Sequence, residues 1–259
     1  MISCIESYID SENNYYGCFV IEPLEPGHAI TLGNALRRTL LSDLTSYSIA
    51  GVRINELKHE FSSIEGVRED VLEILLNLKE IIFKATFISN KRYRNQKSHI
   101  KPLKAFLAVT GPVIVTAGMF RLPRNVLKIL NPTQYICTLV DESDFFLEID
   151  VERGKGYVLA EEKRKKRIPE IFELTEPSTL LIDTLYSPIK KVNYKVKLIY
   201  DVYGNIKESL IFEITTNGSI TPKRSLLEAN KILLNLFYTL FLTPSFLKLS
   251  AAFQKKLYP

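Results

Sequence analysis

Apolar residues recur at helical spacing in three segments of the 259-residue chain, at residues 30–42, 63–84 and 221–240. In each segment they follow an i, i+3, i+4, i+7 pattern, so one face of each helix is expected to be buried. The last segment begins with Thr221 and Pro222, a capping residue followed by the residue favoured at the first helical position.

The first of these helices has two distinct faces. Leu32, Leu36 and Leu40 form an i, i+4 row, which must be buried because so short a helix is only marginally stable alone. Thr31 is expected to cap its start by accepting a hydrogen bond from an unpaired backbone N–H. The leucines favour either the chain's own core or a joint between subunits, and the pattern does not separate the two.

The other face of this helix is polar. Asn34 and Arg38 lie one turn apart, and Arg37 stands about 100° around the helix from Arg38. Two arginines that diverge by this angle would not serve one partner surface equally. A solvated face and a contact with a larger partner both remain open.

Alternation of apolar and polar residues predicts strands between the helices. A turn at Tyr203-Gly-Asn205 joins two of these strands into a hairpin. A chain that mixes antiparallel hairpins with three helices belongs to the α+β class. The expected strands lie at residues 18–24, 48–57, 106–115, 134–140, 145–151, 180–183, 194–200 and 210–214.

Composition excludes several classes of protein. Hydrophobic residues make up 46% and charged residues 24%, which is ordinary for a globular protein, and a net charge of +5 permits an acidic partner without requiring one. The three cysteines form no CxxC pair, and His59-Glu60 has Ser63 where a metalloprotease needs its second histidine. No metal site, cofactor site, membrane span or targeting segment is therefore expected.

Two basic stretches, residues 84–104 and 163–167, are interpreted as solvated loops. A contact with nucleic acid is the weaker interpretation, because clustered cations next to a tyrosine can bind phosphate. Its candidate residues are Lys91, Arg92, Arg94 and Lys97.

Several blocks, taken in order, resemble the alpha subunit of bacterial and plastid-type DNA-directed RNA polymerases. The most specific block runs from Leu24-Glu25-Pro26-Gly27 into Thr31-Leu-Gly-Asn-Ala-Leu-Arg-Arg38. Together the blocks extend over residues 22–240. The others are His59-Glu-Phe-Ser62, Glu65-Gly-Val67, Leu75-Leu-Asn-Leu-Lys79, Gly111-Pro-Val113, Arg153-Gly-Lys-Gly-Tyr157, Tyr186-Ser-Pro188 and Thr216-Asn-Gly218.

The resemblance implies a fold in which both ends of the chain build one domain. Residues 1–50 and 179–245 would form a discontinuous dimerisation domain, an antiparallel sheet with two long helices, as in the family's N-terminal region. Residues 51–178 would form an inserted, mostly β domain. Residues 246–259 are expected to be a basic tail, and the family's small C-terminal domain is expected to be absent.

The resemblance also implies a function and its site residues. The chain would homodimerise and scaffold assembly of the beta and beta-prime catalytic subunits, without catalytic residues of its own and touching DNA only through the assembled complex. Arg38 would contact the beta subunit, supported by Asn34, Arg37 and Lys79. The dimer interface would contain Leu32, Leu36, Leu40, Leu226, Leu233, Leu236, Phe237 and Leu240.

The composition also bears on the compartment, and a second function remains open. Abundant Lys, Ile and Asn suggest an A/T-rich gene, which favours a plastid-encoded protein of the chloroplast stroma over a bacterial cytoplasmic one. The alternative to an assembly subunit is an autonomous nucleic-acid-binding module. Such a module would bind nucleic acid alone, with an affinity that falls steeply with salt.

Overall fold

The computed structural model divides the chain into two units, which are described separately. Unit 1 contains residues 1–44 and 189–259, and unit 2 contains residues 45–188. Within them the structure describes residues 2–11, 13–55, 57, 59–86, 102–123, 126–166 and 179–241. Residues 91–97, with the four candidate nucleic-acid contacts, and the predicted tail at 246–259 lie outside these ranges.

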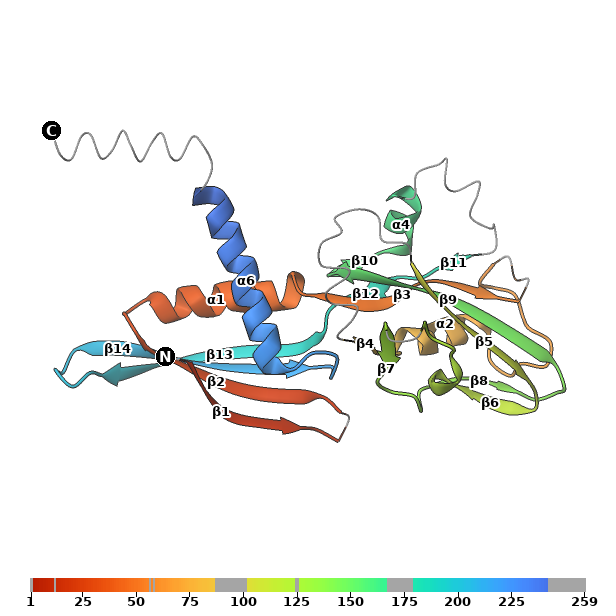
Figure 1. Ribbon diagram of the computed structural model, residues 1–259, viewed down its shortest axis with the longest axis horizontal. Helices are drawn as coiled ribbons and strands as arrows, with labels where there is room; N and C mark the ends of the chain where they lie inside the picture. Colours follow the sequence, from red (N-terminus) through yellow and green to blue (C-terminus); the bar gives the residue numbers. More distant parts are fainter. Residues whose placement is uncertain are drawn as a thin grey trace. The chain divides into compact units, whose positions relative to one another are not determined.

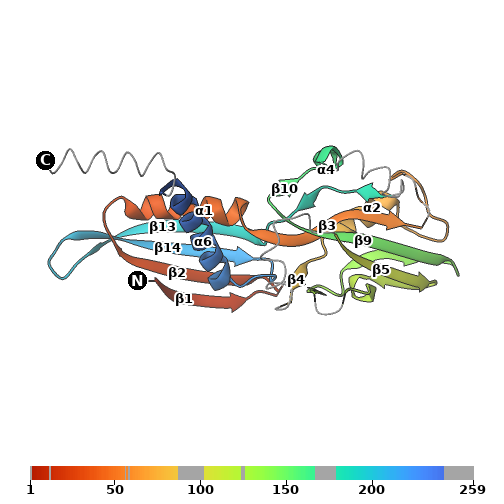
Figure 2. The same ribbon diagram turned by 45° about the horizontal axis from the view of Figure 1, so that its top comes forward.

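Unit 1 is a four-stranded antiparallel sheet with two helices on one face (Figure 1, Figure 2). Its strand order is β1-β2-β14-β13, so the first two strands of the chain pair with the last two. The helices are α1 (His28–Ser42) and α6 (Pro222–Phe241). The strands are β1 (Ile2–Ile9), β2 (Tyr15–Leu24), β13 (Ile189–Tyr200) and β14 (Ile206–Thr216).

The core of unit 1 lies between the sheet and the two helices. Leu36 and Leu40 of α1 join Phe212 and Ile214 of β14 in one buried cluster, to which α6 contributes Leu226. The helical row therefore faces the chain's own sheet. Gly33 makes this approach possible, because a Cβ at this position would lie 2.8 Å from the Tyr194 ring of β13.

The start of α1 is held by a residue far along the chain. Glu208 of β14 accepts hydrogen bonds from the backbone N–H groups of Gly27 at 2.9 Å and Ala29 at 3.0 Å. Both bonds lower the pKa of the Glu208 carboxyl, and the bond from Gly27 has the larger effect. The predicted cap at Thr31 is wrong, because its hydroxyl instead donates back to the Gly27 carbonyl at 3.1 Å.

Unit 2 is built around a second antiparallel sheet, of order β11-β3-β9-β5. Its long strands β3 (Thr45–Ile54) and β9 (Asp144–Lys155) pair along their lengths, and β5 (Leu103–Thr110) pairs with the other side of β9. Helix α2 (Val71–Lys79) contributes Ile74 and Leu78 to the core beneath this sheet.

Short elements complete unit 2. Three two-stranded ribbons pair β4 with β7, β6 with β8 and β10 with β12. Their strands are β4 (Phe83–Ala85), β6 (Val113–Thr116), β7 (Leu127–Ile129), β8 (Tyr135–Leu139), β10 (Tyr157–Val158) and β12 (Thr184–Leu185). The rest are the 3-10 turn η1 (Ala117–Met119), helix α4 (Ala160–Lys166) and strand β11 (Leu180–Leu181).

Several predicted elements need correction. The helix expected over residues 63–84 is limited to α2. Before α2, Gly66 has φ +76° and Val67 forms a β-bridge with Leu139, so this part of the chain follows the ribbons instead. The solvated loop expected over residues 163–167 overlaps helix α4, and the sequence pattern gave no sign of β1.

The unit boundaries also differ from those predicted at residues 50/51 and 178/179. Strand β3 pairs with β9 from Thr45 onward, which draws residues 45–50 into unit 2. Leu180 and Leu181 pair with β3, and β12 pairs with β10, so the chain returns to unit 1 only at Ile189. Strand pairing therefore sets the boundaries.

Candidate subunit interface

The exposed side of α1 carries a stripe of mixed chemistry. Asn34, Arg37 and Arg38, which were predicted to contact a partner, are all exposed. Ile30, Asn34, Arg37 and Leu41 form one exposed row at i, i+4, i+7 and i+11 spacing, and Arg38 is exposed beside this row. Sequence reasoning missed Ile30 and Leu41, because it considered only the apolar row at Leu32, Leu36 and Leu40.

Helix α2 carries a similar exposed stripe in unit 2. Lys79 lies exposed in its last turn, and Leu72 and Leu76 precede it at i−7 and i−3 on the same side. Leu76 and the exposed Ile114 of β6 line an open groove of about 660 Å³. In each unit, therefore, a helix carries a surface that combines exposed leucine or isoleucine with a cation. Such a mixture of apolar and charged side chains is expected of a protein interface.

The groove beside α2 has a fixed polar wall. The Glu69 carboxylate accepts hydrogen bonds from the Tyr135 hydroxyl and from the Thr138 N–H, the latter at 2.7 Å. Asn77 donates to the Ile136 carbonyl at 3.0 Å. Burial, followed by the bond to Glu69, raises the pKa of Tyr135. These contacts hold α2 against β8 and fix the direction of its exposed stripe.

Three residues predicted to form a dimer interface are instead internal. Leu36 and Leu40 have no exposed area, and Leu226 is 4% exposed, because the sheet of the same chain covers them. Leu32 and Leu233 are half-buried against the same core. A side chain already enclosed by its own sheet cannot supply area to a partner, so the interface interpretation is wrong for Leu36, Leu40 and Leu226.

The second half of α6 differs from its first half. Pro222, Ser225, Leu226 and Ala229 are buried against the sheet. Leu236, Phe237 and Leu240, also predicted interface residues, are 57%, 62% and 58% exposed. Leu234, Tyr238 and Phe241 are exposed as well, so apolar side chains surround this end of the helix.

Lys163, the first residue of the basic stretch at residues 163–167, is not available to contact phosphate. Lys163 of α4 is buried and donates from Nζ to the Ile182 carbonyl at 2.9 Å and to the Thr184 hydroxyl. The same ammonium lies 5.7 Å from the centre of the Tyr186 ring. Lys163 therefore anchors α4 to the strand that follows.

A partly buried ion network joins the central strands of unit 2. Arg53 of β3 contacts Glu148 at 2.8 Å and Asp150 at 3.0 Å on β9, and donates to the Thr179 hydroxyl at 2.9 Å. The hydrogen bond from Arg53 lowers the pKa of Glu148. This network helps fix the register of β3 against β9, and Lys104 adds a further contact to Glu148 at 2.9 Å.

Other chemistry is sparse in the described part of the chain. Among these residues, no three His, Cys, Asp or Glu side chains lie close enough together to hold a metal ion. In the same residues no helix has the length and apolar content needed to cross a bilayer. Cys4, Cys18 and Cys137 are free, and burial, followed by the charge of Glu69, raises the pKa of Cys137 to about 12.

Comparison with known proteins gives the same family for both units. The family model of the RNA polymerase Rpb3/RpoA insert domain matches residues 52–187, which lie within unit 2. The DNA-directed RNA polymerase subunit alpha of Pyropia yezoensis is 45% identical over 239 residues, which are 92% of this chain and 70% of that protein. The chain belongs to the RNA polymerase alpha subunit family.

Further members of the alpha subunit family match over the same extent. The alpha subunit of Cyanophora paradoxa is 42% identical over 91% of this chain and 68% of its own length. That of Trichormus variabilis is 40% identical over 91% of this chain and 69% of its own length. The matched length covers more than the insert domain, so the strands and helices of unit 1 share the ancestry of unit 2.

Proposed function

We propose that this alpha subunit forms a homodimer and serves as the platform on which the beta and beta-prime subunits of a DNA-directed RNA polymerase assemble. The observation that carries the proposal is the uncharged second half of α6, which the chain's own sheet leaves bare. A monomer with six large apolar side chains exposed on one helix end would associate or aggregate. Membership of the alpha subunit family supports this role over other assemblies.

In this proposal the stripe on α1 contacts the beta subunit. Arg38 is the central residue, because a guanidinium can bind carboxylates or carbonyls through two parallel hydrogen bonds. Asn34 and Arg37 support it on the same helix, and Lys79 with Leu76 contributes the corresponding stripe on α2. Apolar residues beside the cations would exclude water and strengthen these bonds.

The chain acts as a non-catalytic subunit of the nucleotidyltransferase complex in this proposal. Its relatives include alpha subunits of Pyropia yezoensis and of the Trichormus variabilis strain, and a plastid stroma is the favoured compartment over a bacterial cytoplasm. Purified alone, the chain should incorporate no nucleotide into RNA. Incorporation by the isolated chain above background would contradict the non-catalytic role.

Co-expression with the two large subunits tests the assembly role. Arg38→Ala should leave the dimer intact but reduce recovery of the beta subunit on an affinity-tagged alpha subunit by about tenfold or more, the loss expected when a charged partner is removed. Arg121→Ala removes an exposed arginine of unit 2 that belongs to neither stripe, and should recover beta normally. Equal recovery with both variants would refute the role of Arg38.

A further inference from the structure

The two edges of the sheet in unit 1 carry different side chains. Among the described residues, β1 and β13 are the outermost strands of this sheet, and each pairs with one neighbour. Strand β1 contains no lysine, arginine or proline. The β13 edge carries four lysines, the side chains that most often keep a sheet from accepting a further strand: Lys190, Lys191, Lys195 and Lys197. One edge is therefore protected against strand addition and the other is not.

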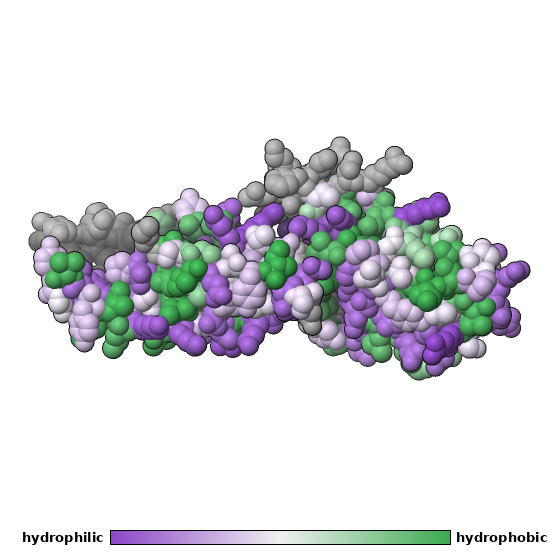
Figure 3. All heavy atoms as spheres, turned by 90° about the horizontal axis from the view of Figure 1, so that it is seen from below, coloured by the Kyte–Doolittle hydropathy of each residue, from purple (hydrophilic) through white to green (hydrophobic). Residues whose placement is uncertain are grey.

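Strand β1 presents apolar side chains along this unprotected edge. All eight of its residues are exposed, and the large apolar ones are Ile2, Ile5, Tyr8 and Ile9. β1 is the lowest element of unit 1 in Figure 1, and the view from below shows hydrophobic patches among polar residues on this side (Figure 3). An edge strand also presents a row of backbone N–H and C=O groups that its own sheet does not pair. Such an edge is a template for one more strand.

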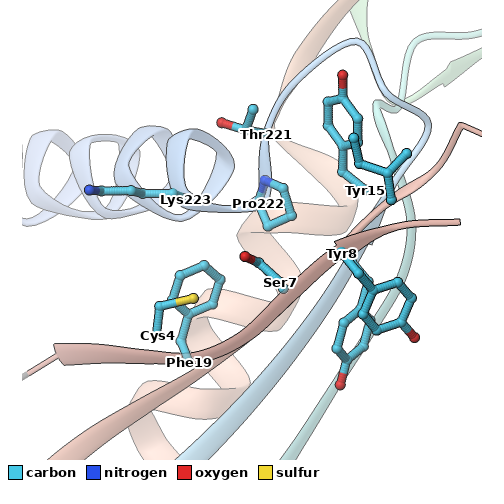
Figure 4. Close-up of a pocket in the computed structure, with 11 residues that line it drawn as sticks. Cys4, Ser7, Tyr8, Tyr15, Phe19, Thr221, Pro222 and Lys223 are labelled. Carbon is cyan, nitrogen blue, oxygen red and sulfur yellow. The ribbon is translucent and has the colours of Figure 1, made fainter.

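One side of β1 faces the start of α6. Figure 4 shows Ser7 directed towards Pro222, with Cys4 beside Phe19. These residues line an open groove of about 660 Å³, in which Lys223 is the only charged residue among those that form its lining. A side chain that an added strand directs to this side would lie along the groove, so an apolar side chain fits there.

The opposite side of β1 is acidic and aromatic. Glu6 and Tyr8, two positions apart, project to this side, and the Tyr8 ring stacks on that of Tyr16 with ring centres 4.7 Å apart. Residues 2–11 contain Glu6 and Asp10 but no cation. A lysine or arginine that an added strand directs to this side would pair with the Glu6 carboxylate and lie within reach of the Tyr8 ring.

Charge decides between the possible occupants of the edge. A second copy of β1 would bring the same acidic residues, Glu6 and Asp10, against their counterparts with no cation to offset them. An extended segment in which apolar and basic residues alternate would instead place apolar side chains along the groove and cations beside Glu6. Its chemistry is complementary to both sides of β1.

We propose that β1 receives an extended basic segment of another protein as a fifth strand of the sheet in unit 1. Backbone hydrogen bonds to the edge of β1 supply the affinity, and the alternating apolar and basic side chains supply the specificity. This edge is distinct from the stripes on α1 and α2 and from the second half of α6. The inference therefore goes beyond the proposed function and does not depend on it.

A synthetic peptide tests the charge preference on the full chain. An eight-residue peptide that alternates valine and lysine, blocked at both ends, should bind about tenfold or more tightly than a valine–glutamate peptide of the same length. Glu6→Lys should weaken binding of the valine–lysine peptide about tenfold or more. Glu142→Lys makes the same change of net charge at an exposed position of unit 2 and should leave binding unchanged. Equal binding of both peptides, or equal weakening by both variants, would overturn the proposal.

Backbone methylation of the peptide separates strand addition from side-chain attraction. In an extended peptide the N–H groups of the valines point to one edge and those of the lysines to the other. N-methylation of one set should abolish binding, because that set faces β1, and N-methylation of the other set should leave most of it. The same response to both modified peptides, whether loss or retention, would show that no strand is added.

Hydrogen exchange locates the added strand. Saturating valine–lysine peptide should slow exchange of the backbone amides in residues 2–9, which gain partners, and leave residues 189–200 unchanged. Protection at residues 189–200, or at neither edge, would refute the assignment to β1. Arg38→Ala, which tests the proposed function, should not alter peptide binding, so failure of either proposal leaves the other standing.

Discussion

Helix α1 and the second half of α6 carry similar apolar patterns, yet the structure treats them differently. The leucines of α1 are enclosed by β13 and β14, whereas Leu236 and Leu240 of α6 are more than half exposed. The difference arises because the sheet of the same chain covers only the first half of α6, where Leu226 and Ala229 are buried. Apolar periodicity therefore identifies a face that must be covered, and only the fold identifies which molecule covers it.

The largest change in stability should come from shortening a buried leucine of α1, and the matched change is made in the second half of α6. Leu36→Ala should cost about 2–5 kcal/mol of unfolding free energy, because it leaves a cavity in the core of unit 1. Chemical denaturation at several protein concentrations would measure it. The loss should be similar at each concentration.

Leu240→Ala is the matched variant in α6. It should instead raise the dissociation constant of the dimer, and its effect on unfolding should depend on protein concentration. If Leu36→Ala behaved as Leu240→Ala does, the division between an internal and an external helix surface would be wrong.

A smaller effect is expected where α1 lies closest to the sheet. Gly33→Ala should destabilise the protein by about 1–3 kcal/mol, because the new methyl group would lie 2.8 Å from the Tyr194 ring. In an uncrowded helix the same change stabilises by about 0.5–1 kcal/mol, so the sign alone is informative. Combining Gly33→Ala with Tyr194→Ala should cost less than the sum of the two single changes.

The smallest effect should be a pH dependence at the start of α1. The folded state lowers the pKa of Glu208, so its stabilising effect is present above the ordinary glutamate pKa of about 4.3 and is lost as the pH falls through the lowered value. The melting temperature of Glu208→Gln should therefore lie below that of the native chain at pH 6 and approach it towards pH 3. Glu142→Gln, at an exposed position, should follow the native curve throughout.

Strong local patterns allowed much of the fold to be predicted. The row at Leu36 and Leu40, the hairpin around Gly204 and the helix after Pro222 all appear, because each depends on neighbours close in sequence. Strand β1 was missed because it is exposed on both sides and so lacks an alternating burial pattern. The cap from Glu208 could not be predicted, since nothing near Gly27 in the sequence indicates it.

The candidate interface was only partly predictable, for a similar reason. The exposed position of Arg38 follows from the helical period, but its apolar neighbours Ile30 and Leu41 look like ordinary core residues in the sequence. Lys163 shows the opposite error, because a lysine in a charged run gives no sign that it will be buried against Thr184. In each case the decisive contact joins segments far apart along the chain.

The pairing of β2 with β14 has a consequence for the order of synthesis. Strand β2 and helix α1 leave the ribosome first, but the strands that cover the leucines of α1 begin only at Ile189. At the usual rates of translation this interval is on the order of ten seconds, long enough for the contiguous residues of unit 2 to fold. During that time the leucines of α1 can pack only against Phe19 and Ile21 of β2 and lack the cover of β13 and β14, so the nascent chain depends on chaperones or on rapid completion to keep them from other hydrophobic surfaces.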